Sequence, residues 1–350
     1  MIVIMTCGKE ENAMSNKRVA WVDVGKYLCI MFVILSHLES NTDMLENFYS
    51  PVFLTTFFFL SGYVYKPSPN FQEHFKKKMK GLLLPWFVFS NFIIISSSIA
   101  SFREEQNTLL RILWNLYQIR ALGDEMWFVA ALFIAFVPFY FTIKWNKPTC
   151  AIILSCSLSV ISRVYQVMMN PEIFPWKSVA MPWHLEYIFQ GMLWMVLGYY
   201  YKVYLETMLE KWSNKIVSIG GWILYLVLVY MPICVSDMSY YEIPVSYIKS
   251  AVGIIVIVCL SKKIKSNKMM RFVGGNTLTY FGLHGKVYAV IEKLIITFAN
   301  DIYLLCLENE VYSSILAIVL TIIISFVLIP PAMIINRWLP WVLGRKSCKA

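Results

Sequence analysis

Long apolar blocks alternate with short polar segments along almost the whole chain. The blocks run for roughly 16–24 residues with few charges, which is the length that spans a lipid bilayer as a helix. We therefore predict an all-α polytopic membrane protein with about ten transmembrane helices. They are expected at residues 19–38, 51–66, 82–100, 126–143, 150–167, 185–201, 216–233, 247–261, 277–298 and 312–335. A short leader (1–17), a transmembrane domain (18–340) and a basic tail (341–350) complete the expected organisation.

The loops between these helices differ in charge. One alternating set comprises the N-terminus, every second loop and the C-terminus, and it holds most of the loop lysine and arginine residues. The other set holds Arg103, Arg111, Arg120, Arg163 and Lys177. Cytoplasmic loops of membrane proteins carry the excess of positive charge. Both termini are therefore expected in the cytoplasm, with the protein in the cell inner (plasma) membrane.

Composition agrees with this class. Hydrophobic residues make up 58% of the chain and charged residues only 15%, whereas a soluble domain has about 25% charged residues. The net charge of +10 would indicate a nucleic-acid partner on a soluble protein. Because the positive charge belongs to the loops, we expect a lipid bilayer as partner and no nucleic acid.

The eight cysteines show no C-x-x-C spacing, and several lie inside apolar blocks. We interpret them as small buried residues and expect neither a disulfide framework nor a metal site. The N-terminal stretch lacks a basic region and a full apolar region, so it does not resemble a secretory signal. Met14 is a second candidate for the start of the chain.

The first predicted helix carries three ionisable residues on one face. At 100° per residue, Lys26 and His37 differ by about 20° after full turns, and Asp23 lies within about 40° of His37. Lys26 and His37 are separated by about 16 Å along the axis. Ionisable residues inside a spanning helix are costly and usually functional. The alternative is an ordinary interfacial Asp–Lys pair with an interfacial histidine at the helix end.

Other polar candidates lie at the ends of later helices. His284 is in the ninth predicted helix, and His184 and Glu186 lie at the outer mouth of the sixth, near Trp127 and Trp183. Positions 184 and 186 would face different sides of one helix. They can cooperate only if His184 precedes the helix. The alternative interpretation is that His184 is a solvated loop histidine.

A basic segment precedes the third predicted helix and contains Lys77, Lys78 and Lys80. It is typical of a cytoplasmic loop, and it could also bind a phosphorylated ligand, since lysines act as point charges on phosphates. His74 lies in the same segment, and we interpret it as solvated.

Six segments of the chain, in this order, resemble the acyltransferase family 3 membrane O-acyltransferases, and most closely the fucose 4-O-acetylase-like branch. They are "RVAWVDVGKYLCIMFVILSH", "TTFFFLSGYVYK", "KKKMKGLLLPWF", "EMWFVAALF", "MPWHLEYIFQGMLWMVLGYYYK" and "GGNTLTYFGLHG". Together with their spacing they cover about residues 18–335.

The resemblance implies about ten spanning helices and transfer of an acyl group, usually acetyl from acetyl-CoA, to a hydroxyl of a cell-surface glycan such as capsule, O-antigen or exopolysaccharide. The family has a basic residue, ten intervening residues and a histidine in its first helix, which match Lys26 and His37. It also has a basic pair before the third helix that is associated with acyl-CoA. Lys77 and Lys80 are the nearest match, with Lys78 beside them.

The resemblance also suggests a role for each of the candidate site residues. His37 is either a general base toward the acceptor hydroxyl or itself carries the acetyl group. Asp23 would hold Lys26 in place, and His284 would bind the acyl carbonyl or shape the site. Glu186 is expected to be a further catalytic residue. Trp127, Trp183 and His184 would bind the sugar.

Two other functions are compatible with many helices and intramembrane charges. A polytopic transporter or flippase for a glycan or a small anionic solute is the main alternative, although transporters often show internal repeats and none is evident in the sequence. A structural subunit of an envelope complex is the other, but it would not need three ionisable groups on one face of the first helix.

Overall fold

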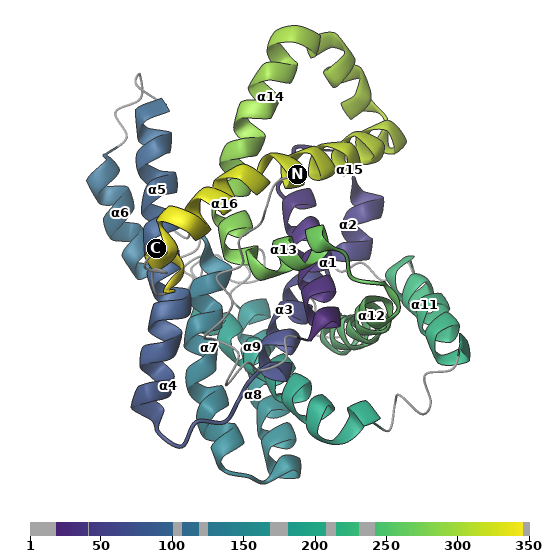
Figure 1. Ribbon diagram of the computed structural model, residues 1–350. Coiled ribbons are helices and arrows are strands. Elements are labelled where there is room, and N and C mark those ends of the chain that lie inside the picture. The colour runs from purple at the N-terminus through teal and green to yellow at the C-terminus, as the bar shows by residue number, and fades with distance from the viewer. Residues whose placement is uncertain are drawn as a thin grey trace.

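In the computed structural model the chain forms a bundle of helices (Figure 1). The structure describes residues 19–40, 42–100, 107–118, 125–168, 181–207, 215–230 and 242–345. No β-strand occurs among these residues. The predicted leader at 1–17 lies outside the described residues, as do residues 346–350 of the predicted tail.

Helices and short helical turns follow one another along the chain. They are α1 (Ala20–Leu35), α2 (Asp43–Tyr49), α3 (Phe53–Tyr63), α4 (Phe71–Lys78), η2 (Met79–Leu83), α5 (Leu84–Ala100), α6 (Thr108–Tyr117), α7 (Trp127–Lys144), α8 (Pro148–Met168), η3 (Pro182–His184), α9 (Leu185–Tyr200), η4 (Tyr201–Leu205), α11 (Lys215–Tyr230), α12 (Glu242–Lys263), α13 (Lys268–Gly275), α14 (Thr277–Glu308), α15 (Glu310–Val327), α16 (Ile329–Trp338) and η5 (Pro340–Leu343).

The all-α prediction is confirmed for the described residues, and each of the ten predicted segments overlaps at least one helix there. Among the described residues, five helices are long and apolar enough to cross a membrane: Phe71–Ile99, Trp127–Lys144, Pro148–Met168, Glu242–Lys263 and Glu310–Trp338. These helices support a membrane protein. The short helices α2, α6 and α13 were not predicted, because each is shorter than the windows that reveal a spanning segment.

The basic segment before α5 is a helix, where the sequence pattern indicated a loop. α4, η2 and α5 follow one another without a break from Phe71 to Ala100. The side chain of Asn70 accepts a hydrogen bond from the backbone N–H of Gln72 at 2.9 Å and so caps the start of α4. His74 is only 5% exposed and packs against Tyr65 and Tyr140. The prediction of a solvated His74 is therefore wrong.

α3 and α9 pack backbone to backbone at the centre of the bundle. A Cβ atom on Gly62 of α3 would lie 1.9 Å from the carbonyl oxygen of Met195 of α9. A Cβ atom on Gly198 of α9 would lie 2.0 Å from the carbonyl oxygen of Phe59 of α3. Small residues at helix contacts allow this close approach in membrane proteins. The two glycines therefore determine how closely α3 and α9 can pack.

α1 is surrounded by other helices, and it contacts α3, α12, α13, α14 and α15. Nine of its residues are buried, among them Asp23. On one side of the bundle α14 and α15 extend as a hairpin, while α5 with α6 and α11 with α12 lie at its flanks (Figure 1). Asp23 therefore lies inside the protein, and Lys26 one turn later is half-buried.

Candidate active site

The structure brings two of the predicted site histidines together. The ring centroids of His37 and His284 lie 4.7 Å apart, with an interplanar angle of 78°. His37 lies two residues beyond the end of α1, and His284 lies in the third turn of α14. His37 is exposed, whereas His284 is buried. We call these two residues the histidine pair.

Both rings are oriented by hydrogen bonds to the backbone one turn earlier. Nδ1 of His37 lies 2.8 Å from the carbonyl oxygen of Val33, and Nδ1 of His284 lies 2.9 Å from that of Phe281. A carbonyl oxygen can only accept, so in each neutral ring Nδ1 carries the hydrogen and Nε2 keeps its lone pair. Nε2 of His284 is buried and makes no hydrogen bond. The pair therefore presents two basic nitrogen atoms.

A cavity of about 740 Å³ opens beside the start of α1, and we call it the basic cavity. Five of its lining residues are charged. Asp23 and Lys26 lie in the first two turns of α1, and Lys66, Lys202 and Arg345 lie beyond the ends of α3, α9 and η5. The rest of its wall is largely apolar and includes Ile30, Phe128 and Phe281. The ring of Phe281 lies 6.0 Å from that of His284. Neither histidine is among the described residues that line the basic cavity, but Phe281, which does line it, lies beside the histidine pair.

The charged end of the basic cavity is built around the junction of α13 and α14. A Cβ atom on Gly274 would lie 2.2 Å from the carbonyl oxygen of Asp23, so a side chain there would push α13 away from α1. Arg345 donates hydrogen bonds to the carbonyl oxygen of Gly275 at 3.0 Å and to the side chain of Asn336 at 2.6 Å. The C-terminal part of the described chain is thereby held at this cavity.

The three predicted cofactor lysines lie in the helical run that leads to the same cavity. Gly81 and Leu82 line the basic cavity, and Lys80 precedes them directly. Nζ of Lys78 lies 3.3 Å from the centre of the Phe136 ring, which is a cation–π contact. Lys78 also lies within electrostatic range of Lys77 and Lys26. None of the three is among the described residues that line the cavity.

Sequence reasoning missed Lys66, Lys202 and Arg345 as site residues. Each resembles an ordinary loop or tail charge, because nothing in the local pattern distinguishes it from its neighbours. The structure brings them together from the end of α3, from η4 and from the C-terminal segment. Their one sequence signal is that each follows a helix at its predicted cytoplasmic end.

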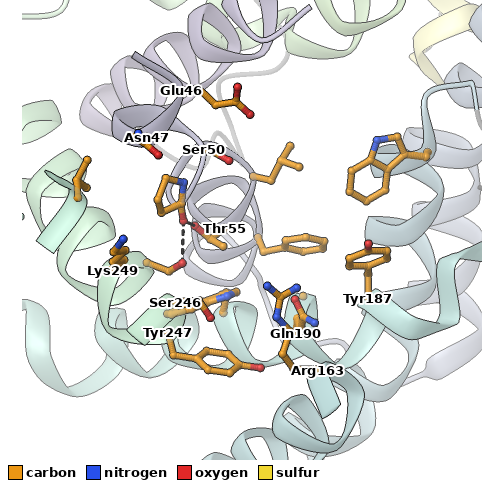
Figure 2. Close-up of a pocket in the computed structure, with 18 of the residues that line it drawn as sticks. Glu46, Asn47, Ser50, Thr55, Arg163, Tyr187, Gln190, Ser246, Tyr247 and Lys249 are labelled. Carbon is orange, nitrogen blue, oxygen red and sulfur yellow. Dashed lines mark hydrogen bonds between the residues drawn. The ribbon is translucent and has the colours of Figure 1, made fainter. Parts of the chain in front are cut away.

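A second cavity, of about 810 Å³, is rich in aromatic side chains, and we call it the aromatic cavity. Trp127, Tyr187, Trp194, Tyr230 and Tyr247 line it. Its polar lining includes Glu46, Asn47, Arg163, Gln190 and Lys249, from α2, α8, α9 and α12 (Figure 2). Figure 2 shows Glu46 and Asn47 on one wall and Tyr187, Gln190 and Arg163 on the facing wall.

The two cavities extend toward opposite ends of the bundle. α3 contributes its first residues to the aromatic cavity and its last residues to the basic cavity. α9 likewise contributes Tyr187 and Gln190 to the aromatic cavity, and Lys202 in the following η4 lines the basic cavity. A molecule could therefore enter each cavity from a different end.

His184 and Glu186 lie directly behind the aromatic cavity. The ring of Trp127, which lines the cavity, is 5.3 Å from that of His184. Nδ1 of His184 lies 3.8 Å from Oε1 of Glu186, and both side chains are buried. His184 precedes α9 and adopts a left-handed backbone conformation, φ 53°. The geometry required for His184 and Glu186 to cooperate is thus present.

Trp183 has a different environment from Trp127. Its ring packs against that of Trp86 at 5.3 Å. It is not among the described residues that line either cavity.

Across the described residues, no group of three or more histidine, cysteine or acidic side chains is arranged as metal ligands.

Residues 19–330 of the chain match the family model Acyl_transf_3, an acyltransferase domain. Comparison with curated proteins and with solved structures gave no match. The family match covers most of the chain, from the start of α1 to the start of α16, and includes the histidine pair and most of both cavity walls. The chain therefore belongs to acyltransferase family 3 and is a membrane acyltransferase.

Proposed function

We propose that the protein is an integral O-acetyltransferase of the cell inner membrane, which transfers acetyl from acetyl-CoA to a hydroxyl of a cell-surface glycan. One observation carries the proposal. In the histidine pair, which has two Nε2 lone pairs, His284 lies one helical turn beyond Phe281, and the Phe281 ring lines a cavity that also has five charged lining residues.

The charge distribution of the basic cavity supports acetyl-CoA as the donor. Coenzyme A carries several phosphates at one end and a long, mostly uncharged arm that ends in the thioester. Lys66, Lys202 and Arg345 at the mouth suit the phosphates, because lysine acts as a point charge and arginine binds phosphate in a bidentate manner. The helical run with Lys77 and Lys80 adds positive charge beside the mouth. The apolar interior suits the arm and the thioester.

The side chains of the aromatic cavity support a sugar acceptor. Aromatic faces stack on sugar rings, and the surrounding amide, hydroxyl and charged groups can hydrogen-bond to ring hydroxyls. Trp127 and Tyr187 would provide such faces, and Asn47 and Gln190 such hydrogen bonds. His184 and Glu186 would position Trp127 from behind. In this proposal Trp183 supports Trp86 rather than contacting the sugar.

The positions of the cavities support the expected orientation of the chain. If both termini are cytoplasmic, the basic cavity at the start of α1 faces the cytoplasm, where acyl-CoA is made. The aromatic cavity then faces the outside, where a glycan or a lipid-linked precursor is presented. Donor and acceptor would thus enter from opposite sides of the membrane.

In the proposed reaction His37 acts as general base. The acceptor oxygen bonds to the acyl carbon while its proton passes to Nε2 of His37. The carbon–sulfur bond then breaks, and the coenzyme leaves as a thiolate that takes up a proton. A positioned base of this kind contributes about 10²–10⁴ in rate. In the two-step variant Nε2 of His37 attacks the thioester first and passes the acetyl group on.

The orientation of His284 limits what that residue can do. Because its Nδ1 hydrogen is donated to the backbone, a neutral His284 offers only a lone pair at Nε2. It can then accept a hydrogen bond, and it binds an acyl oxygen only when protonated. We therefore propose that His284 chiefly orients His37 and helps to hold its proton.

A transporter or flippase remains the alternative, because two cavities at opposite ends of a bundle also suit transport. The test is transfer of label from radiolabelled acetyl-CoA to extracted surface glycan, in membranes with equal amounts of wild type or His37→Ala. Label on the glycan with wild type and none with His37→Ala supports the proposal. No label with either protein, together with altered glycan export, supports the transporter.

A further inference from the structure

The two cavities are adjacent but separate. They share none of the described residues that line them, yet residues next to each other in the chain line opposite cavities. Phe57 lines the basic cavity and Phe58 the aromatic cavity. In the same way Phe128 lines the basic cavity and Trp127 the aromatic cavity. The wall between the cavities is therefore only about one side chain thick at these positions.

Phe128 lies at the centre of this wall. Its ring centroid is 5.0 Å from that of Phe58, 5.7 Å from Phe57 and 5.9 Å from Phe281. It is 4% exposed. The four rings come from α3, α7 and α14, and we call them the aromatic partition. Centroid separations of about 4.5–7 Å are typical of packed aromatic pairs, so the four rings pack together at this position between the cavities.

The rings of the aromatic partition also pack against residues outside it. A Cβ atom on Gly191 of α9 would lie 2.5 Å from the Phe58 ring, so Phe58 packs directly on the α9 backbone. Phe281 lies beside His284 on α14. These contacts leave little freedom for Phe58 and Phe281 to move away from Phe128.

The basic cavity ends at the partition without any charged group. The lining residues at this end are Ile30, Phe57, Phe128, Leu132 and Phe281. An acyl chain that extends beyond the thioester would therefore meet a ring surface. The distance from the histidine pair to this surface limits how many methylenes fit once the thioester carbonyl is in place.

From this geometry we propose that Phe128 sets the upper length of the acyl chain that the enzyme transfers. The inference rests on the proposed function, in which the basic cavity holds an acyl-CoA. The reaction is the same for every chain length: the acyl carbon bonds to the acceptor oxygen, and the carbon–sulfur bond breaks. Only the space for the acyl tail differs. A short acyl group fits between the histidine pair and Phe128, and each added methylene must displace the ring.

The test compares acetyl-, butyryl- and hexanoyl-CoA as competing donors in membranes that contain wild type or Phe128→Ala. The measured quantity is the ratio of butyryl to acetyl on the acceptor. One methylene in an apolar pocket is worth roughly 10–200-fold in discrimination. The ratio is therefore expected to rise at least about tenfold in Phe128→Ala.

Phe133→Ala is the matched control. Phe133 is a buried ring of the same helix, but it packs on Phe75 and is not among the described residues that line either cavity. The control is expected to leave the butyryl-to-acetyl ratio unchanged. An equal rise in both variants would mean that general loosening of α7 relaxes selectivity, and it would overturn the role of Phe128.

Three further results would overturn the inference. One is an unchanged ratio in Phe128→Ala while acetyl transfer persists. Another is a wild type that transfers hexanoyl as readily as acetyl. The third concerns Phe57→Ala, which removes a second ring of the same wall and is used if Phe128→Ala does not insert in the membrane. An unchanged butyryl-to-acetyl ratio in Phe57→Ala would also overturn the inference. Absence of acetyl transfer by the wild type would instead contradict the proposed function itself.

Discussion

Replacement of Gly62 by alanine tests the close packing of α3 on α9. The added Cβ atom would lie 1.9 Å from the carbonyl oxygen of Met195. Ordinary contact begins at about 3.4 Å, so the two backbones must separate by about 1.5 Å. A backbone carbonyl cannot rotate away as a side-chain tip can. Overpacking costs typically 1–3 kcal/mol, and we expect a loss of about 3 kcal/mol at this rigid contact.

The separation is expected to disturb both cavities, because α3 and α9 contribute to each of them. The measurement is the thermal midpoint of the purified protein in detergent. At roughly 2 °C per kcal/mol for a large domain, the midpoint of Gly62→Ala should fall by about 6 °C.

Gly220→Ala is the matched control, because a Cβ atom on Gly220 of α11 meets nothing within 4 Å. Alanine is better than glycine inside a helix by roughly 0.5–1 kcal/mol, so this variant should be as stable as wild type or slightly more stable. Equal midpoints for Gly62→Ala, Gly220→Ala and wild type would refute the argument that α3 and α9 pack backbone to backbone.

Three further predictions concern the two cavities. Arg345→Gln should raise the KM for acetyl-CoA about twofold to fivefold, since an exposed charge pair is worth at most about 1 kcal/mol; an unchanged KM would contradict a role in phosphate binding. The wild-type KM for acetyl-CoA should also rise with salt, because salt screens exposed charges; titration with sodium chloride measures this, and no change would contradict it. Trp127→Ala should raise the KM for the glycan acceptor at least about fivefold, because truncation of a residue that matters at a binding interface costs more than about 1 kcal/mol. It should leave the KM for acetyl-CoA unchanged. Trp183→Ala is its control, and equal effects of both variants on the acceptor KM would contradict a sugar-binding role for Trp127.

Much of the helical organisation follows from local patterns. Apolar blocks of membrane-spanning length predict helices whatever their neighbours are, so all ten predicted segments overlap helices of the described residues. The ends are less predictable. α1 stops at Leu35 and not at residue 38, because the hydrogen bond from the backbone N–H of His37 to Ile34 tightens the chain into a turn. α14 continues to Glu308, ten residues beyond the prediction, with an irregular residue at Ala299.

The candidate site was only partly predictable. The spacing of Asp23, Lys26 and His37 indicates one face of a helix, and the structure places Asp23 and Lys26 together in the basic cavity. Nothing in the spacing indicates that His284, far along the chain, lies against His37. That contact depends on how α14 packs against α1, and close packing is a property of the whole bundle.

The incorrect prediction for His74 has a similar origin. Charged neighbours indicate exposure, and Lys76 and Lys77 are indeed exposed. His74 lies on the opposite, inward face of α4 and packs against Tyr65 and Tyr140. If the segment is treated as a helix, the exposed lysines and His74 fall on different faces, and His74 is then expected to be buried.

The most direct test of the account is the acetyl transfer rate of His37→Asn. An asparagine amide can still donate to the carbonyl oxygen of Val33, as Nδ1 of His37 does, but it has no basic nitrogen in the place of Nε2. The fold is thus preserved while the base is removed. We predict that transfer from acetyl-CoA to the glycan falls at least about 100-fold, at equal amounts of inserted protein. Transfer within a few-fold of wild type would contradict a role for His37 in the chemistry.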